Sequence, residues 1–216
     1  MSVAVYRLAS RMAGSSHVLL LALPFTFYGL LWRALRSSSV ILELGCGEYS
    51  CLRRIGRGEH LIGADTSVAR VRVAKSRRYH DDYVVCDVNN MPFRPKLVDA
   101  IVGFELVEHL KEEEARNLIN QSEILARKIV VFSTPNGFVH LERQDDPSMT
   151  HKSGFTSAEL KRMNFRVLGA QGLQVLYPRN ELNAGRTRTV LWLLSHPFAF
   201  FLPEEASTLL FFKRIH

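Results

Sequence analysis

Short apolar runs alternate along the chain with longer stretches in which apolar and charged residues recur at helical spacing. Five of these runs stop at glycine, proline, asparagine or an acidic residue, which is typical of buried strands that end in a turn. They occupy residues 39–45, 60–67, 83–93, 97–105 and 126–137, and helical patterns lie at 68–79 and 105–125. Because strands and helices alternate, the pattern predicts a parallel sheet with helices on both faces.

The last third of the chain continues the same domain. Residues 156–165 predict a helix capped by Thr156 or Ser157, and residues 165–172 and 209–215 read as closing strands. We therefore expect one α/β domain over residues 40–216. Two irregular inserts, near 138–156 and 171–203, lie where a substrate would be chosen.

The first 39 residues form an apolar segment ahead of this domain. Val18 to Trp32 is a run of 15 mostly apolar residues that includes a proline and a glycine, which is short for a membrane span. A small-residue cleavage site of the kind that ends a signal peptide is not evident after it. The prediction is a helix that caps the domain, and contact with a membrane surface is the alternative.

Composition adds two constraints. The three cysteines form neither a disulfide framework nor a zinc pattern, so a reducing compartment is the simpler interpretation. We expect a cytoplasmic protein, with association with a membrane as the alternative. The formal net charge of +7 permits an anionic partner without demanding one.

Polar residues gather where the predicted strands end. Glu43, Asp65 and Asp87 each stand at the end of one of the first three strands, and Gly45 and Gly47 form a turn after the first. In an open parallel sheet, ligands bind beyond the carboxyl ends of the strands. The sequence therefore predicts a ligand site at this edge, with a carboxylate at Asp65 suited to a ribose diol.

These motifs resemble those of the class I S-adenosylmethionine-dependent methyltransferases, in the broad group that acts on small molecules and lipids. The resemblance rests on "LELGCG", "GADTS", "CDVNNMPF", "VDAIVGFELVEHL" and "STPNG". It implies a Rossmann-like fold with a mostly parallel, seven-stranded sheet. Tyr49 replaces a glycine that the family often has, and Ser50 stands where a dinucleotide motif would need its third glycine. The motif thus favours S-adenosylmethionine over a dinucleotide.

The resemblance also implies which residues hold the cofactor. Glu43 and Gly45 would lie by the methionine part, Asp65 at the ribose, and Asp87 with Val88 at the adenine. Phe104 would lie next to the sulfonium or else serve in core packing. The full predicted set is Glu43, Gly45, Cys46, Gly47, Asp65, Thr66, Asp87, Val88 and Phe104.

On the acceptor side, Glu105, Glu108 and His109 fall at helical spacing i, i+3, i+4, and His151 follows in a later loop. This arrangement resembles the E-x-x-E-H…H pattern of small-RNA 2′-O-methyltransferases and ubiquinone O-methyltransferases, which hold a divalent cation. The favoured interpretation is metal-free, with His109 as base or pocket wall beside Glu108. A cation bound by all four side chains is the alternative.

The expected reaction is in-line methyl transfer to a small-molecule or lipid-linked acceptor, with oxygen as the acceptor atom. Apolar stretches at 18–32 and 190–203 suggest a hydrophobic lid over the site that binds the acceptor. The alternatives are a metal-assisted RNA 2′-O-methyltransferase and a non-catalytic S-adenosylmethionine-binding protein. Nucleic acid is disfavoured as a partner because aromatic residues do not interleave with the basic residues at 53–57 and 70–78.

Overall fold

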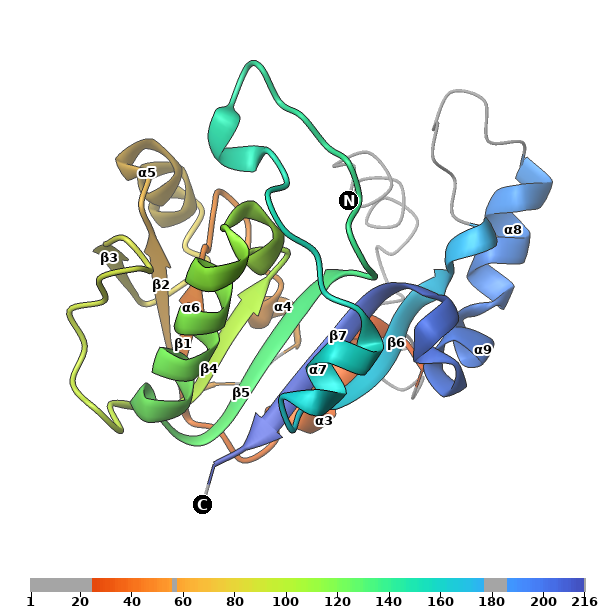
Figure 1. Ribbon diagram of the computed structural model, residues 1–216. Coiled ribbons are helices and arrows are strands. Elements are labelled where there is room, and N and C mark those ends of the chain that lie inside the picture. Colours follow the sequence, from red (N-terminus) through yellow and green to blue (C-terminus); the bar gives the residue numbers. More distant parts are fainter. Residues whose placement is uncertain (1–24, 56–57, 177–185, 216) are drawn as a thin grey trace.

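The computed structural model describes residues 25–55, 58–176 and 186–215. Its centre is a seven-stranded sheet in the order β3-β2-β1-β4-β5-β7-β6, shown in Figure 1. The strands are β1 (Val40–Leu44), β2 (His60–Asp65), β3 (Asp82–Val85), β4 (Val98–Phe104), β5 (Ala126–Pro135), β6 (Arg166–Leu173) and β7 (Ala206–Arg214). The predicted fold class, with both closing strands, is confirmed.

All pairings from β3 to β5 are parallel, whereas β7 runs antiparallel to both β5 and β6. Strand β1 lies between β2 and β4, so the chain order reverses beside it. Such a switch point opens a crevice at the carboxyl ends of the strands, which is where ligands bind in sheets of this kind. The polar ends of β1 and β2 therefore meet at the position that the sequence predicts for a ligand.

Helices cover both faces of the sheet. One face packs against α6 (Glu112–Leu125) and α7 (Ser157–Arg162), and the other against α3 (Phe27–Ala34) and α4 (Leu52–Ile55). Helix α5 (Val68–Ser76) lies beside β2 and β3. Each face has a continuous apolar core, which fixes the strand ends relative to one another.

Helix α3 is the described part of the predicted N-terminal cap. Thr26 caps it by accepting a hydrogen bond from the backbone N–H of Gly29 at 3.1 Å. Leu31 and Leu35 are fully buried against the sheet. Residues 1–24 lie outside the described part of the chain, so the extent of the cap and its boundary at residue 39 stay predictions.

The predicted helix over 105–125 is divided in two. A short 3₁₀ helix, η1 (Val107–His109), precedes α6, which begins at Glu112. The backbone of Glu105 is left-handed, with φ +49°, so the chain turns sharply after β4 instead of starting a helix. Glu114 accepts a hydrogen bond from the backbone N–H of Lys111 at 2.9 Å and so marks the start of α6.

The apolar stretch near the C-terminus forms α8 (Arg186–Leu194) and α9 (His196–Phe201), after the short η3 (Gln174–Leu176). Helix α9 lies directly on β6. The close approach is evident at Gly169, where an added Cβ would come within 1.8 Å of the carbonyl oxygen of Ala199. Within the described residues, no helix is both long and apolar enough to span a membrane. The cytoplasmic location stays a prediction.

Candidate functional site

The loop between β1 and α4 carries two glycines with left-handed backbones. Gly45 has φ +64° and Gly47 has φ +55°, a region that other residues adopt only with strain. A Cβ at Gly45 would lie 2.8 Å from the side chain of Leu106, whereas one at Gly47 would meet no atom of residues 25–55, 58–176 or 186–215 within 4 Å. The left-handed backbone therefore favours glycine at position 45, next to the Leu106 side chain, and Gly47 leaves open space at the mouth of the crevice.

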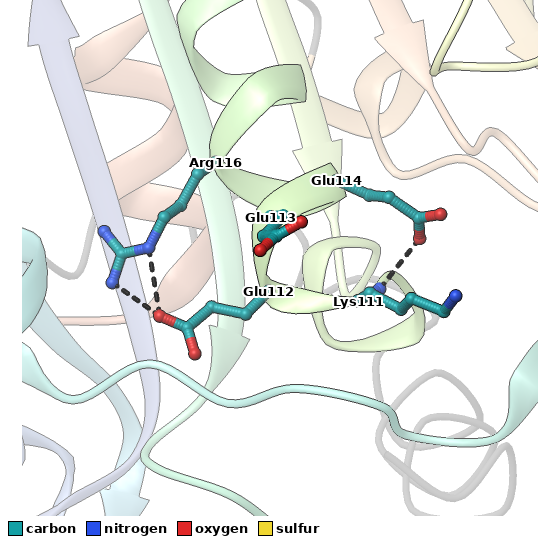
Figure 2. Close-up of a pocket in the computed structure, with 5 residues that line it drawn as sticks. All are labelled: Lys111, Glu112, Glu113, Glu114 and Arg116. Carbon is teal, nitrogen blue, oxygen red and sulfur yellow. Dashed lines mark hydrogen bonds and ion pairs between the residues drawn. The ribbon is translucent and has the colours of Figure 1, made fainter.

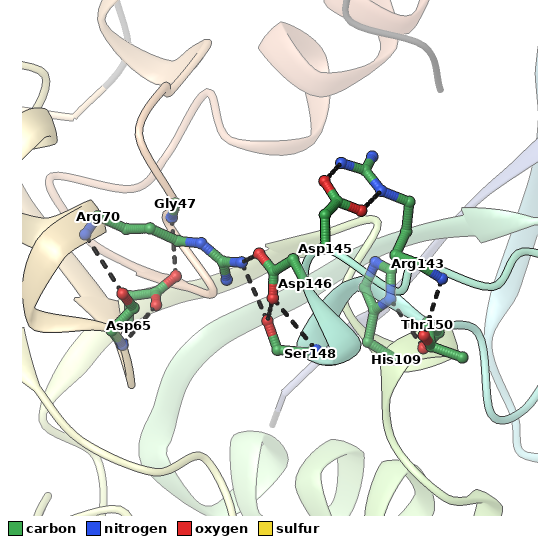
Figure 3. Close-up of polar contacts among 10 residues, drawn as sticks. Gly47, Asp65, Arg70, His109, Arg143, Asp145, Asp146, Ser148 and Thr150 are labelled. Carbon is green, nitrogen blue, oxygen red and sulfur yellow. Dashed lines mark hydrogen bonds and ion pairs between the residues drawn. The ribbon is translucent and has the colours of Figure 1, made fainter.

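Asp65, at the end of β2, fixes this loop in place. Its Oδ2 accepts a hydrogen bond from the backbone N–H of Gly47 at 2.9 Å, and its Oδ1 accepts one from Ser67 at 2.8 Å. Figure 3 shows the contact between Asp65 and Gly47. The side chain is buried, at 5% exposure. Asp65 thus holds the glycine loop as well as lying where a ribose was predicted.

Glu43 lies beneath the same loop in a buried cluster of polar side chains. Its Oε2 accepts a hydrogen bond from Ser50 Oγ at 2.5 Å and lies 2.6 Å from Nε2 of His80. All three residues are buried. Neither His80 nor Ser50 was predicted from the sequence as a partner of Glu43, because His80 is 37 residues from Glu43 and gives no local signal.

The carboxylates act on Cys46, the residue between the two glycines. Its thiol is buried, and its backbone N–H donates to the carbonyl of Ala64 at 3.0 Å. Burial, followed by the negative charges of Glu43 and Asp65, raises the pKa of the thiol to about 12. Cys46 is therefore a neutral thiol at physiological pH, so it serves in packing and is not a nucleophile.

The remaining predicted cofactor residues differ in their exposure and in their contacts. Thr66 and Asp87 are exposed, and Val88 is buried. The Oδ1 of Asp87 accepts a hydrogen bond from the backbone N–H of Asn89 at 2.9 Å, which closes a turn after β3. Phe104 packs its ring against Phe27 of α3 at 5.6 Å, so it serves the core between the sheet and that helix. Its role toward a cofactor stays a prediction.

On the acceptor side, Glu108 is buried on η1. Its Oε2 accepts a hydrogen bond from Thr134 Oγ1 at 3.2 Å, while its Oε1 is buried and has no hydrogen-bond partner among the residues that the structure describes. Burial raises the pKa of Glu108 well above its usual range, and the nearby charge of Glu105 adds to the effect. An unpartnered buried carboxylate oxygen of this kind is a common feature of ligand sites.

Two imidazoles face this carboxylate. The rings of His109 and His151 lie 5.0 Å apart. The Nδ1 of His109 lies 3.3 Å from the carbonyl oxygen of Thr150, and the Nδ1 of His151 lies 2.7 Å from that of Val139. A carbonyl only accepts, so each Nδ1 carries the proton and each Nε2 keeps its lone pair. Burial lowers the pKa of His109 to about 4, which keeps the ring neutral.

Three of the four side chains in the predicted cation set converge. Glu108, His109 and His151 each offer a ligand atom, and these atoms lie within 4.8 Å of one another. Glu105 is bound elsewhere, because its Oε1 accepts a hydrogen bond from Ser133 Oγ at 2.9 Å. The structure therefore supports a cluster of three in which a cation could sit, while the four-residue set stays a prediction.

The loop after β5 (residues 136–156, the post-β5 loop) runs between the two halves of the site. Arg70 of α5 forms an ion pair with Asp146 and donates to Ser148 Oγ at 3.0 Å. Further along the loop, the Thr150 carbonyl accepts from His109. Both contacts appear in Figure 3. The loop is thus fastened to the cofactor side at one point and to the acceptor side at another.

A separate surface depression lies at the start of α6 (Figure 2). Two of its lining side chains, Arg116 and Glu112, form an ion pair with each other at 2.8 Å. The lining residues are Lys111, Glu112, Glu113, Glu114 and Arg116. None of the predicted site residues lines it, and its acidic groups make it unsuited to an anionic ligand.

Comparison with known proteins gives a family match over part of the domain. Residues 41–127 match the family model described as a methyltransferase domain. A SAM-dependent methyltransferase from Archaeoglobus fulgidus has a similar structure, with a TM-score of 0.56, 15% identity, and coverage of 97% of this chain and 99% of the other. A structure of the complex between the Haloferax volcanii Trm112 methyltransferase activator and a methyltransferase is also similar, with a TM-score of 0.59 and 14% identity. The match covers 94% of this chain and 95% of the other. At such identities these structures support the fold alone.

Curated relatives are similar over about half of the chain. The probable tRNA methyltransferase 9B of Bos taurus is 29% identical over 118 residues, covering 51% of this chain and 25% of the relative. An Arabidopsis thaliana tRNA (carboxymethyluridine(34)-5-O)-methyltransferase is 28% identical over 123 residues, covering 55% and 28%. The chain thus spans little more than a quarter of the length of these relatives.

These relatives overturn two expectations from the sequence. The expected small-molecule or lipid-linked acceptor was wrong, and so was the expectation that nucleic acid is an unlikely partner, since the relatives are named as tRNA methyltransferases. The physical reason lies in the apolar stretch near the C-terminus, which packs on β6 at the far end of the sheet. That stretch therefore does not support the expected hydrophobic lid over the crevice at β1.

Proposed function

We propose that this chain, a class I S-adenosylmethionine-dependent methyltransferase by fold and by family, methylates RNA at an oxygen atom. The observation that carries the proposal is its similarity to tRNA methyltransferases over about half of its length. The net charge of +7 suits a polyanionic substrate.

The glycine loop fits the methyl donor. Gly47 leaves open space above the loop, Asp65 lies at its side, and the exposed Thr66 follows at the end of β2. When bound, S-adenosylmethionine supplies an electrophilic methyl group, so the protein needs mainly to orient the acceptor and to exclude water. We assign the donor side to Gly45, Gly47 and Asp65, with Glu43 supporting the loop from below.

The acceptor side offers a proton acceptor. The Nε2 of His109 keeps its lone pair because its Nδ1 faces the Thr150 carbonyl. A neutral imidazole in this position can take the proton from an acceptor hydroxyl as the new bond to carbon forms. Its low pKa makes it a weak base, so its contribution comes mainly from position.

A second candidate is favoured by the cluster of Glu108, His109 and His151. Neutral imidazoles that donate from Nδ1 to backbone carbonyls are typical of metal-binding histidines. The unpartnered Oε1 of Glu108 supplies a third ligand. A divalent cation held there would orient ribose hydroxyls, which suits a metal-assisted RNA methyltransferase.

The proposed function is tested by the transfer of radioactive methyl groups from S-adenosylmethionine. Deproteinised total tRNA and a total lipid extract, each from the source organism, are incubated separately with the protein. We expect label in tRNA that becomes nuclease-soluble, and loss of label with Asp65→Ala. Label confined to the lipid fraction, or no label in either while S-adenosylhomocysteine binds, would contradict the proposal.

The cation is tested separately by titration with Mn²⁺ in the absence of RNA. Binding in the wild type that is lost in Glu108→Gln and in His151→Asn would support the cluster as a metal site. His140→Asn is the matched control, because His140 is an exposed histidine on the same loop. No Mn²⁺ uptake by the wild type would leave His109 as a base without metal.

A further inference from the structure

The post-β5 loop holds its two limbs against each other and against η1. The backbone N–H of Gly137 donates to the carbonyl of Phe155 at 2.9 Å, and that of His151 donates to Leu141 at 2.9 Å. On the other limb, the N–H of Lys152 donates to the carbonyl of Glu108 at 2.7 Å. These hydrogen bonds fix the backbone of the loop next to Glu108, His109 and His151, which we call the acceptor cluster.

Phe138 is the aromatic residue presented by this fixed backbone. Its side chain is 60% exposed, and it follows Gly137, whose φ of +75° turns the chain. A Cβ added at Gly154 would lie 2.4 Å from the Cα of Phe138, so the two limbs are in close contact at this point. An exposed aromatic ring on a backbone packed this closely is preorganised for a partner, because little backbone entropy remains to be lost.

The position of Phe138 in the chain ties it to the acceptor cluster. The next residue, Val139, supplies the carbonyl oxygen that lies 2.7 Å from the Nδ1 of His151. The ring of His151 is in turn 5.0 Å from that of His109. Phe138 is thus one residue away from a group in contact with the acceptor cluster.

A cation stands on the opposite limb. Lys152 directly follows His151 in the chain, and its side chain is exposed. An exposed ring and an exposed ammonium group on the two limbs of one loop match the two chemical parts of a nucleotide. Aromatic side chains stack on bases of any identity, and lysine neutralises phosphate.

We propose that Phe138 and Lys152 form the subsite that holds the acceptor nucleotide, with the base stacked on Phe138 and a neighbouring phosphate paired with Lys152. This proposal rests on the proposed function, since it requires an RNA substrate. It places the aromatic platform in the loop after β5.

The test compares two probes that share a charge pattern. One is a fluorescently labelled ten-nucleotide oligouridylate, and the other is a ten-unit abasic ribose-phosphate oligomer with the same label. We expect Phe138→Ala to weaken binding of the oligouridylate by about 5- to 140-fold, the equivalent of one lost base stack. The same variant should bind the abasic oligomer as the wild type does, because that probe has no base to stack.

Lys152→Gln should behave differently. It should weaken both probes and lower the slope of log affinity against log salt by about one phosphate contact. Phe138→Trp should keep the affinity for oligouridylate, and Phe198→Ala is the matched control. Phe198 is a 63% exposed phenylalanine on α9, which packs on β6.

Binding of S-adenosylhomocysteine, measured for every variant, verifies that the donor side is intact. If the wild type binds neither tRNA nor oligouridylate, the proposed function fails. If it binds oligouridylate and Phe138→Ala binds it equally well, or loses both probes equally, the platform is wrong while RNA binding stands. In a separate sedimentation assay with phosphatidylcholine–phosphatidylserine vesicles, loss of vesicle binding in Phe138→Ala with unchanged oligouridylate binding would assign the ring to a lipid surface and overturn the proposal.

Discussion

Removing the carboxylate of Asp65 should cost both stability and donor affinity. In Asp65→Ala, the backbone N–H groups of Gly47 and Ser67 lose a charged acceptor at 2.9 and 2.8 Å. A hydrogen bond to a charged group is worth roughly 1.5–3 kcal/mol. Both donors lie in partly buried residues that water can reach in part, so we expect a loss of about 2–4 kcal/mol in unfolding free energy.

This loss translates into a lower melting temperature. For a domain of this size, 1 kcal/mol corresponds to about 2–4 °C, so Asp65→Ala should melt about 4–16 °C below the wild type. The affinity for S-adenosylhomocysteine, measured by isothermal titration, should fall by about one to two orders of magnitude, because the glycine loop is no longer held.

Asp87→Asn is the matched control. Asp87 is exposed, and an asparagine there keeps an oxygen that can accept from the backbone N–H of Asn89. Its melting temperature should stay within about 2 °C of the wild type, as for a surface substitution. The reasoning would be refuted if Asp65→Ala melted as the wild type does, since that would mean that the loop does not depend on the carboxylate.

Two further predictions concern the buried groups near the loop. His80→Leu removes the imidazole that lies beside the Glu43 carboxylate and should lower the unfolding free energy by about 1–3 kcal/mol, as measured by chemical denaturation. His80→Gln retains an N–H donor at a similar reach and should recover much of the lost free energy. Equal losses in both variants would assign the effect to ring packing. Cys46 should react with iodoacetamide at pH 8 about 10³-fold more slowly than an ordinary exposed thiol, because its pKa of about 12 leaves little thiolate. Rapid labelling of Cys46 in the folded protein, measured by peptide mass spectrometry, would contradict the burial of the thiol.

The fold was predictable because its signals are local. Each buried strand appears in the sequence as an apolar run that ends in a turn residue, and Thr156 appears as the start of a helix, where it caps α7. The helix expected from residue 105 was the exception. Helical spacing of Glu105, Glu108 and His109 concealed a turn, because the left-handed backbone of Glu105 and the capping contact of Glu114 override that periodicity.

The site was predictable only in part, because some of its contacts join distant residues. Glu43 and Asp65 are recognisable from their place at strand ends, but the pairing of Glu43 with His80 follows only from the sheet that places β3 beside β2. The significance of Phe138 is hidden in the same way. It occurs in a loop without periodicity, and its backbone position depends on the close approach of Gly154 and on the contact of the next residue, Val139, with His151.

The buried cluster beneath the glycine loop also constrains how this sequence can evolve. The His80 ring fills the space above Gly63, where a Cβ would lie 2.8 Å from Nδ1, and its Nε2 and the hydroxyl of Ser50 share one oxygen of Glu43. A side chain at position 63 therefore requires either a shift of the neighbouring strands or a smaller residue at position 80, and in the second case the carboxylate loses a partner. Homologous chains should change these four positions together, and a lineage that acquires alanine at position 63 while retaining the histidine should carry a shifted strand β2 or β3.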